Sequence, residues 1–305
     1  MAQMKEVKIY AVVVTYNAMP WLERCMGSLR DSSTPVIPIV VDNGSTDDTA
    51  AFIRTHFPDV VLLPQSANLG FGQGNNVGLR YALQHEATHV LLLNQDAWIS
   101  PNMLEMLLTL DDGRSLLSPI HLTGEGDAVD ANFLRNAIQR SEEYERYQNA
   151  PQDTIARYST YEINAACWLL PRVILEQVGG FSPLFFHYAE DTDYLQRLHY
   201  HGYKVYFVSG TYCYHDRAHV APKLPTKQSI YQNLVLRAVD INYSPFRCWL
   251  HELRYGLAVR HTAYRTGRWL DIRYYYQARM ALCRKTSAIR ANRRMIQTTG
   301  PHWLI

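Results

Sequence analysis

The chain has 305 residues, 47% of them hydrophobic, and its five cysteines are scattered without a Cys-x-x-Cys pair. This pattern argues against a disulfide framework or a structural zinc site, and no run of 18 apolar residues is present that would span a membrane. The polar N-terminus does not have the pattern of a signal peptide, so we expect one large cytoplasmic α/β domain, with or without a small appendage.

The net charge of +2 hides two oppositely charged regions. Residues 246–305 contain 12 lysines and arginines but two acids, whereas residues 1–245 contain 18 lysines and arginines and 26 acids. We therefore expect one domain over residues 1–245, followed by a basic, aromatic-rich helical region over residues 246–305. The basic region should contact something anionic.

Apolar runs alternate with helical patterns in the first third of the chain. Each run has the length and composition of a buried strand: residues 9–14, 38–41, 60–63 and 90–93. Helical periodicity follows the first three runs, and Ser45 or Thr46 is the expected cap of the second helix. This alternation predicts an α/β fold with a parallel, doubly wound sheet.

Polar residues directly follow three of these runs. They are Thr15, Tyr16 and Asn17 after the first run, Asp42 and Asn43 after the second, and Asn94, Gln95 and Asp96 after the fourth. Ligands of open α/β sheets bind at the carboxyl ends of the strands, so Asp96 should face a crevice. Two interpretations of Asp96 stay open: the N-cap of a helix that Ser100-Pro101 starts, or a divalent-metal ligand that holds a diphosphate.

A glycine-rich stretch covers residues 68–76. Gly70, Gly72 and Gly74 give G-x-G-x-G rather than G-x-G-x-x-G, and they follow the third strand instead of the first. We therefore reject a dinucleotide-binding motif. The stretch is either a plain loop that caps a helix or a tight backbone whose amides, including Asn75, meet a polar ligand.

The second half of the predicted domain is less regular. Residues 111–162 are polar, and we interpret them as an insertion beside the site where an acceptor substrate binds. Residues 163–170, which include Trp168, form another apolar run, and Gly179-Gly180 ends the helix that follows it. An edge strand is expected over residues 205–208, and His215 lies beyond it.

Three acids lie within four residues after an aromatic segment: Glu190, Asp191 and Asp193. They suit the first turn of a helix, where the helix dipole favours negative charge. They also suit a general base, because partial desolvation raises the proton affinity of a carboxylate.

Together these motifs resemble the inverting family 2 glycosyltransferases of the GT-A fold. More narrowly, they resemble bacterial rhamnosyltransferase-like members that build surface polysaccharides such as lipopolysaccharide. The resemblance covers residues 9 to about 240. Its motifs come in the family's order: Val14-Thr15-Tyr16-Asn17, Val41-Asp42-Asn43-Gly44-Ser45, residues 68–76, Leu93-Asn94-Gln95-Asp96, Gly179-Gly180-Phe181, residues 186–193 and His215.

The resemblance implies roles for single residues. The nucleotide-sugar donor would be bound by Thr15, Tyr16, Asn17, Asp42, Asn43, Gly70, Asn75, Asn94, Gln95 and Trp168. Asp96 would be the remaining acid of an Asp-x-Asp motif that binds Mg²⁺ or Mn²⁺, with His215 as a further ligand or a diphosphate contact. Asp191 would be the catalytic base, and Glu190 would support it. Asn94 stands where the motif has its first acid, so metal affinity should be lower than with two carboxylates.

The predicted reaction transfers a sugar with inversion from a nucleotide-diphosphate donor, dTDP-rhamnose or a UDP-sugar, to a saccharide or polyprenyl-linked saccharide hydroxyl. A catalytically silent GT-A module that binds a glycan or a protein is the alternative. A sugar-phosphate nucleotidyltransferase fits less well. Such an enzyme typically has a glycine-rich loop with basic residues after its first strand, and this chain has Thr15-Tyr16-Asn17 there.

Two interpretations also apply to residues 246–305. They form either a helical subdomain with a solvated basic face or a surface that binds the anionic inner face of the plasma membrane, because arginine, tryptophan and tyrosine on amphipathic helices suit a bilayer interface. Nucleic acid is not expected as a partner, since the acidic domain would oppose it.

Overall fold

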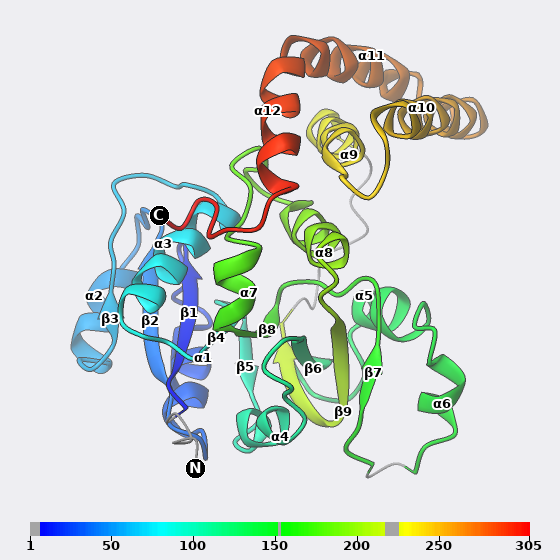
Figure 1. Cartoon of the computed structure of the whole chain (residues 1–305). Coiled ribbons are helices and arrows are strands. Elements are labelled where there is room, and N and C mark those ends of the chain that lie inside the picture. Colours follow the sequence, from blue (N-terminus) through cyan, green and yellow to red (C-terminus); the bar gives the residue numbers. More distant parts are fainter. Residues whose placement is uncertain (1–6, 152–153, 217–225) are drawn as a thin grey trace.

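A computed structural model describes residues 7–151, 154–216 and 226–305 of the chain. It has an α/β body and a group of C-terminal helices at one edge of that body (Figure 1). The last residues run back to the body, where the Gly180 amide donates to the His302 carbonyl at 2.9 Å. In these ranges no helix is both long and apolar enough to cross a bilayer.

Nine strands of the described residues form one mixed sheet in the order β3-β2-β1-β4-β8-β6-β9-β5, with β7 paired to β9. The strands are β1 (Ile9–Thr15), β2 (Ile37–Asp42), β3 (Val61–Leu62), β4 (His89–Asn94), β5 (Ala97–Ile99), β6 (Leu116–Thr123), β7 (Arg157–Ser159), β8 (Cys167–Pro171) and β9 (Val205–His215). The first four strands are parallel to one another, as predicted, whereas β8 runs antiparallel to β4 and β6.

The helices cover the sheet on both sides. In the body they are α1 (Leu22–Arg30), α2 (Thr49–His56), α3 (Phe71–Gln84), α4 (Met103–Thr109), α5 (Ala131–Phe133), the π-helix η1 (Leu134–Ile138), α6 (Tyr144–Gln148), α7 (Arg172–Gln177) and α8 (Glu190–Tyr200). The C-terminal group consists of α9 (Lys227–Val239), α10 (Pro245–Thr266), α11 (Trp269–Arg284) and α12 (Thr286–Ile296).

Two hydrophobic cores lie on opposite faces of the sheet. Alternate residues of β4 point to different cores, because successive side chains of a strand lie on opposite faces: Leu92 belongs to one and Leu91 to the other. Helix α3 packs very close to β1, since a Cβ atom at Gly78 would lie 2.4 Å from Val12. Gly74 of the predicted glycine-rich stretch allows the same close approach, since a Cβ atom there would lie 2.7 Å from Val14.

The register of the parallel strands sets the position of the site. Thr15 pairs with Asp42, and Val14 pairs with Asn94. The carboxyl ends of β1, β2 and β4 therefore meet at one edge of the sheet, as the sequence predicts.

Several local expectations are wrong. Residues 111–162 are not only an insertion, because β6 lies inside the sheet between β8 and β9. The expected edge strand at residues 205–208 is part of the longer β9, which pairs with β5, β6 and β7. The N-cap of α2 is Asp48, rather than Ser45 or Thr46.

Helix α9 packs against α10, α11 and α12, and its apolar residues share a third core with Tyr275 and Ala278 of α11. The C-terminal helical group therefore starts at Lys227, before the predicted boundary at residue 245. The division into residues 1–245 and 246–305 stays a prediction.

Candidate active site

The strand-end residues of β1 and β2 are bonded to each other. The Thr15 hydroxyl lies 3.5 Å from an Asp42 carboxylate oxygen, and the Asn43 amide donates to the Thr15 carbonyl at 2.7 Å. Thr15, Asp42 and Asn43 are all buried. The two strand ends are therefore fixed relative to each other at the place predicted for the nucleotide.

Asn43 also holds the loop that precedes α3. Its side-chain oxygen accepts from the Leu69 amide at 2.9 Å, and its Nδ2 donates to Asn68 Oδ1 at 3.1 Å and to the Gly70 carbonyl at 3.3 Å. One buried amide thus satisfies the polar groups of three residues, which makes this loop rigid.

Asn17 and Gln95 fix the loop after β1. Asn17 has a left-handed backbone (φ 51°), and its side-chain oxygen accepts from the Thr46 amide at 2.8 Å. Gln95 Oε1 accepts from the Tyr16 amide at 2.7 Å. The Tyr16 ring stays 44% exposed, so it is free to cover a ligand that occupies this edge.

Gly70 joins the glycine-rich loop to the aromatic segment before α8. It has φ +80°, and a Cβ atom there would lie 1.9 Å from the Phe186 carbonyl oxygen. The same oxygen accepts from the Phe71 amide at 3.2 Å. Asn75 is buried one turn further along α3, where its Nδ2 donates to the Phe71 carbonyl at 3.0 Å. Its contact with the donor stays a prediction.

Asp96 lies in the turn between β4 and β5, and this turn brings it to His215 at the end of β9. Asp96 Oδ1 is 3.5 Å from His215 Nε2, which is also 3.4 Å from Asn94 Nδ2. The Asp216 amide donates to the Asp96 carbonyl at 2.9 Å and holds the turn in place. The N-cap interpretation of Asp96 is wrong, since the next helix has Asn102 as its N-cap.

The donors around Asp96 suit a hard cation. No three His, Cys, Asp or Glu side chains surround one point in the part of the chain that the structure describes. Asn94 Oδ1, however, is buried and has no hydrogen-bond partner among the described residues, and His215 turns its Nε2 toward the Asp96 carboxylate. Mg²⁺ and Mn²⁺ accept one or two protein ligands when substrate phosphates supply the rest. Asp96, Asn94 and His215 fit such a partial set.

The three acids near residue 190 have different environments. Asp193 is buried and pairs with Arg197 at 3.0 Å, and Arg197 also donates to the Val178 and Gly180 carbonyls. Asp193 is therefore a structural residue that ties α8 to the end of α7. Glu190 and Asp191 open α8 directly after Tyr188 and Ala189, which both have left-handed backbones.

Burial, and after it the negative charge of the neighbouring Asp191, raise the pKa of Glu190 to about 7. The Glu190 side chain is 5% exposed, and its Oε2 has no hydrogen-bond partner in the described ranges. Asp191 is more exposed, and its Oδ1 accepts from the Thr192 amide at 2.8 Å. The pair thus offers one buried carboxyl group that keeps its proton near neutral pH and one accessible carboxylate.

Trp168 does not reach the surface. It is fully buried in β8, with its ring 6.4 Å from Phe181 and 5.9 Å from Tyr194. It can influence a donor only through the packing beneath the site.

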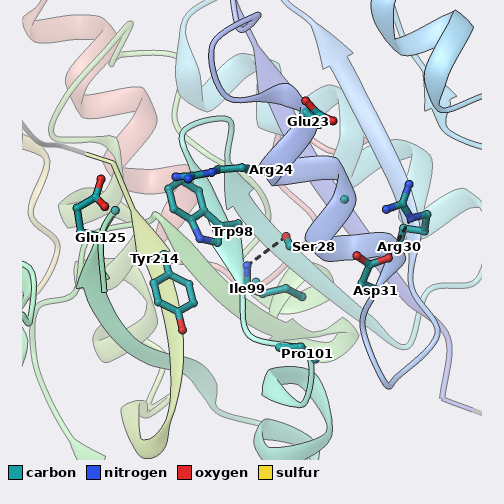
Figure 2. Close-up of a pocket in the computed structure, with 12 residues that line it drawn as sticks. Glu23, Arg24, Ser28, Arg30, Asp31, Trp98, Ile99, Pro101, Glu125 and Tyr214 are labelled. Atoms are coloured by element: carbon teal, nitrogen blue, oxygen red, sulfur yellow. Dashed lines mark hydrogen bonds and ion pairs between the residues drawn. The ribbon is translucent and has the colours of Figure 1, made fainter. Parts of the chain in front are cut away.

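Sequence reasoning missed a pocket of about 560 Å³ between α1, β5 and β9 (Figure 2). The rings of Trp98 and Tyr214 stack at 6.0 Å, and the Arg24 guanidinium lies 5.0 Å above Trp98. Glu23 and Glu125 lie at its rim. Trp98 and Tyr214 are direct partners across two strands that are distant in sequence, so no local pattern revealed the pair.

The site as a whole is the polar carboxyl edge of an α/β sheet, with the carboxylates of Asp96 and Asp191 beside the hydrogen-bonded strand ends. The model of the glycosyl transferase family 2 matches residues 10–179, more than half of the chain, and the chain belongs to this family. It is therefore a nucleotide-sugar glycosyltransferase.

Named relatives and solved structures agree with this assignment. An N-acetylglucosaminyl-diphospho-decaprenol L-rhamnosyltransferase of Mycobacterium tuberculosis is 28% identical over 238 residues, which cover 70% of this chain and 78% of the relative. The dTDP-rhamnosyl transferase RfbF of Shigella flexneri is 31% identical over 100 residues, about a third of each chain (32% and 33%).

Among solved structures, Staphylococcus aureus TarS with UDP-GlcNAc has a TM-score of 0.58 and 17% identity, with 95% of this chain and 90% of that chain covered. The mannosyltransferase PcManGT of Pyrobaculum calidifontis, in complex with GDP-Man and Mn²⁺, has a TM-score of 0.57 and 18% identity, with 96% and 81% covered. These likenesses confirm the predicted GT-A fold with its C-terminal helices.

Proposed function

We propose that this enzyme transfers a sugar, with inversion, from a nucleotide-diphosphate donor to a hydroxyl of a saccharide or lipid-linked saccharide. The observation that carries the proposal is the meeting of Asp96 and His215, 3.5 Å apart, at the sheet edge where Thr15 and Asp42 also end. A diphosphate at that edge would meet the carboxylate through a cation, and the nucleoside would meet the bonded ends of β1 and β2.

In the proposed reaction, an acceptor hydroxyl oxygen attacks the anomeric carbon. The bond from that carbon to the β-phosphate oxygen breaks, and its electron pair leaves with the nucleoside diphosphate. Asp191 takes the hydroxyl proton, as a placed carboxylate does in general base catalysis. A single displacement inverts the anomeric centre. Glu190, which keeps its proton up to about pH 7, limits the negative charge beside Asp191.

Asp96, His215 and Asn94 are the residues we assign to Mg²⁺ or Mn²⁺. The cation would stabilise negative charge on the departing diphosphate as a Lewis acid. The Mn²⁺ complex of PcManGT supports a divalent ion at this fold. Because one carboxylate takes part, we expect weak binding of the free ion and tighter binding with the diphosphate.

For the donor we favour dTDP-rhamnose, with a UDP-sugar as the rival. The names of the M. tuberculosis and S. flexneri relatives support a rhamnosyl donor, while the UDP-GlcNAc complex of TarS supports the rival. The name of the M. tuberculosis relative also supports a polyprenyl-diphosphate-linked acceptor.

The pocket lined by Trp98 and Tyr214 is our candidate for further sugars of the acceptor. Aromatic faces with a few polar groups at the rim suit a ligand that has both C–H surfaces and hydroxyls. Trp98 lies two residues after Asp96, and Tyr214 directly precedes His215. Gly124 and Glu125, from the segment expected to bind the acceptor, line the same pocket.

A thermal-shift screen of dTDP, UDP, GDP and CDP, each with and without Mn²⁺, tests the proposal. A ligand that binds the native state alone raises its apparent stability. We expect one diphosphate to stabilise the chain more strongly with Mn²⁺ present, and the matching nucleotide-sugar to be consumed when a saccharide acceptor is added. Binding without consumption of any donor would favour the catalytically silent module.

A further inference from the structure

We propose that the exposed face of the α10–α11 hairpin docks on an anionic lipid bilayer. We call this surface the hairpin face. It consists of large apolar side chains that are at least one-third exposed: Phe246, Trp249, Leu253, Leu257, Tyr264, Trp269, Tyr276 and Met280. The proposal stands apart from the sugar-transfer reaction and gives a specific surface to the basic C-terminal region.

Helix α10 has three distinct faces. At 100° per residue, Phe246, Trp249, Leu253, Leu257 and Tyr264 all fall within about 80° of one another. The residues that α10 buries against its neighbours lie on another side: Cys248, Glu252, Gly256 and Ala263. The apolar stripe is therefore not the face that packs in the fold, and Leu257 and Tyr264 are 62% and 76% exposed.

The stripe continues onto α11. The Tyr264 and Trp269 rings lie 6.1 Å apart across the turn, and the Arg260 side chain donates to the Tyr276 hydroxyl. The helices approach closely at Gly256, where a Cβ atom would lie 2.4 Å from the Tyr275 hydroxyl. Both exposed stripes thus belong to one surface on two helices rather than to two separate patches.

The charge around this surface has one sign. Exposed arginines and a lysine are spread over α10, α11 and α12: Arg247, Arg254, Arg260, Arg265, Arg273, Arg284, Lys285, Arg290 and Arg294. On α10, Arg247, Arg254 and Arg265 lie together on one flank of the stripe, about 80–100° from Phe246. All three acidic side chains of residues 226–305 are buried: Asp240, Glu252 and Asp271.

The buried acids do not offset the exposed charge at the surface. Glu252 is bonded to Arg279 at 2.9 Å, and Asp271 to Arg268 at 3.1 Å. What remains outside is positive charge beside aromatic and aliphatic side chains, which is the composition of a helix that lies in the interface of an anionic bilayer. A second copy of the chain is a poorer partner, because a symmetric contact would place arginines against arginines.

The hairpin face is connected to the candidate active site through α9. Ile230 and Leu234 of α9 share a core with Tyr275 and Ala278 of α11. On its other side, the Gln232 side chain donates to the His187 carbonyl, three residues before Glu190. A docked hairpin would therefore hold the loop before α8 at a fixed distance from the lipid surface.

Flotation of the full chain with lipid vesicles tests the proposal. The vesicles contain phosphatidylcholine alone, or phosphatidylcholine mixed with phosphatidylglycerol, at low and high NaCl. An apolar variant carries Leu257→Gln, Trp269→Gln and Met280→Gln, and a basic variant carries Arg254→Gln, Arg265→Gln and Arg273→Gln. The matched control replaces three exposed arginines of the body: Arg54→Gln, Arg114→Gln and Arg135→Gln.

We expect the wild-type chain and the control to float with anionic vesicles at low salt. The basic variant should bind them roughly a hundredfold more weakly, since each arginine near an anionic surface contributes a few-fold to tenfold in affinity. The apolar variant should lose roughly tenfold or more, and high salt should reduce wild-type binding.

Equal flotation of the wild type and both hairpin variants would overturn the proposal. So would a lipid-free, concentration-dependent dimer that the apolar variant abolishes in sedimentation, because that result names a second copy as the partner. Diphosphate-induced thermal shifts, measured on the same proteins, should be equal in all variants. Failure of docking is thereby distinguished from failure of the proposed sugar transfer.

Discussion

The two sides of the candidate active site are built differently. Around the ends of β1 and β2, the side-chain oxygens of Asn17, Asn43 and Gln95, the last directly after β4, accept hydrogen bonds from backbone amides. Beside them, at β4, α8 and β9, Asn94 Oδ1, Glu190 Oε2 and His215 Nδ1 are buried without a hydrogen-bond partner in the described part of the chain. On the first side, which we call the closed side, these side-chain oxygens are bonded within the fold. On the second side, buried polar atoms have no hydrogen bond to any described residue.

This difference suggests separate roles for the two sides of the candidate active site. A buried polar atom without a partner costs free energy, and beside a candidate site such an atom is available to a ligand or a reacting group. We expect the closed side to give the proposed nucleotide pocket its shape before the donor arrives. The other side holds the groups we assign to the diphosphate, the cation and the proton. Variants on the two sides should therefore fail in different ways.

The largest expected effect is that of Asp191→Asn. The substitution keeps the shape of the side chain and removes the proposed general base, so kcat should fall about 10²- to 10⁴-fold. Thermal shifts with the donor diphosphate should stay as in the wild type, because Asp191 is assigned to the acceptor proton and not to the nucleoside, the diphosphate or the cation. Asp59→Asn, at an exposed position of the body, is the control. Activity within tenfold of the wild type would move the role of base from Asp191 to Glu190.

Glu190→Gln should change stability in a pH-dependent way. Between about pH 4.5 and 7 the folded chain binds more protons at Glu190 than the unfolded chain does, so raising the pH lowers the free energy of unfolding. The full loss is about 3 kcal/mol above pH 7, as an upper bound from the shift in pKa.

Glutamine has no proton to lose, so the variant should gain stability relative to the wild type as the pH rises. Urea unfolding at pH 5 and pH 8 measures this, with Glu145→Gln, an exposed position, as the control. A difference between variant and wild type that is the same at both pH values would show that Glu190 has no raised pKa.

Asp96→Asn and Asp42→Asn separate the two sides directly. Asp96→Asn should weaken Mn²⁺-dependent binding of the diphosphate about 10- to 100-fold and leave the shift without metal unchanged, because it removes the carboxylate beside His215. Asp42→Asn should weaken binding equally with and without Mn²⁺, since Asp42 lies on the closed side. Thermal shifts over a series of diphosphate concentrations measure both. Identical losses in the two variants would contradict the division.

The sequence predicts the first half of the fold better than the second for a physical reason. Strands β1 to β4 are buried apolar runs that alternate with amphipathic helices, so hydrophobic periodicity and strand-end residues such as Asp42 and Asp96 are enough to locate them. β6 and β9 pair over a long separation, and β6 contains Pro119 and His121 inside the sheet. The local hydrophobic pattern therefore predicted an insertion where β6 lies and an edge strand where β9 lies.

The same limit applies to the site. The motif order pointed to Asp96 and His215, which the fold brings together, but not to the bonds by which Asn43 holds the loop before α3. Trp168 was expected at the donor, yet the alternation of β8 buries its ring in the core. The residue pattern grouped Asp193 with Glu190 and Asp191 as acids at the start of one helix, whereas the structure pairs it with Arg197, one turn away.

Trp98→Ala is expected to have the smallest effect. The pocket of Trp98 and Tyr214 lies outside both sides of the nucleotide site, so its loss should raise the KM for an extended acceptor about tenfold, as removal of one aromatic contact does. The kcat at saturating acceptor and the KM for the donor should stay unchanged. Trp98→Phe keeps an aromatic face and should restore most of the affinity. If Trp98→Ala instead lowers kcat with every acceptor, the ring acts by holding β5, and with it Asp96, against β9.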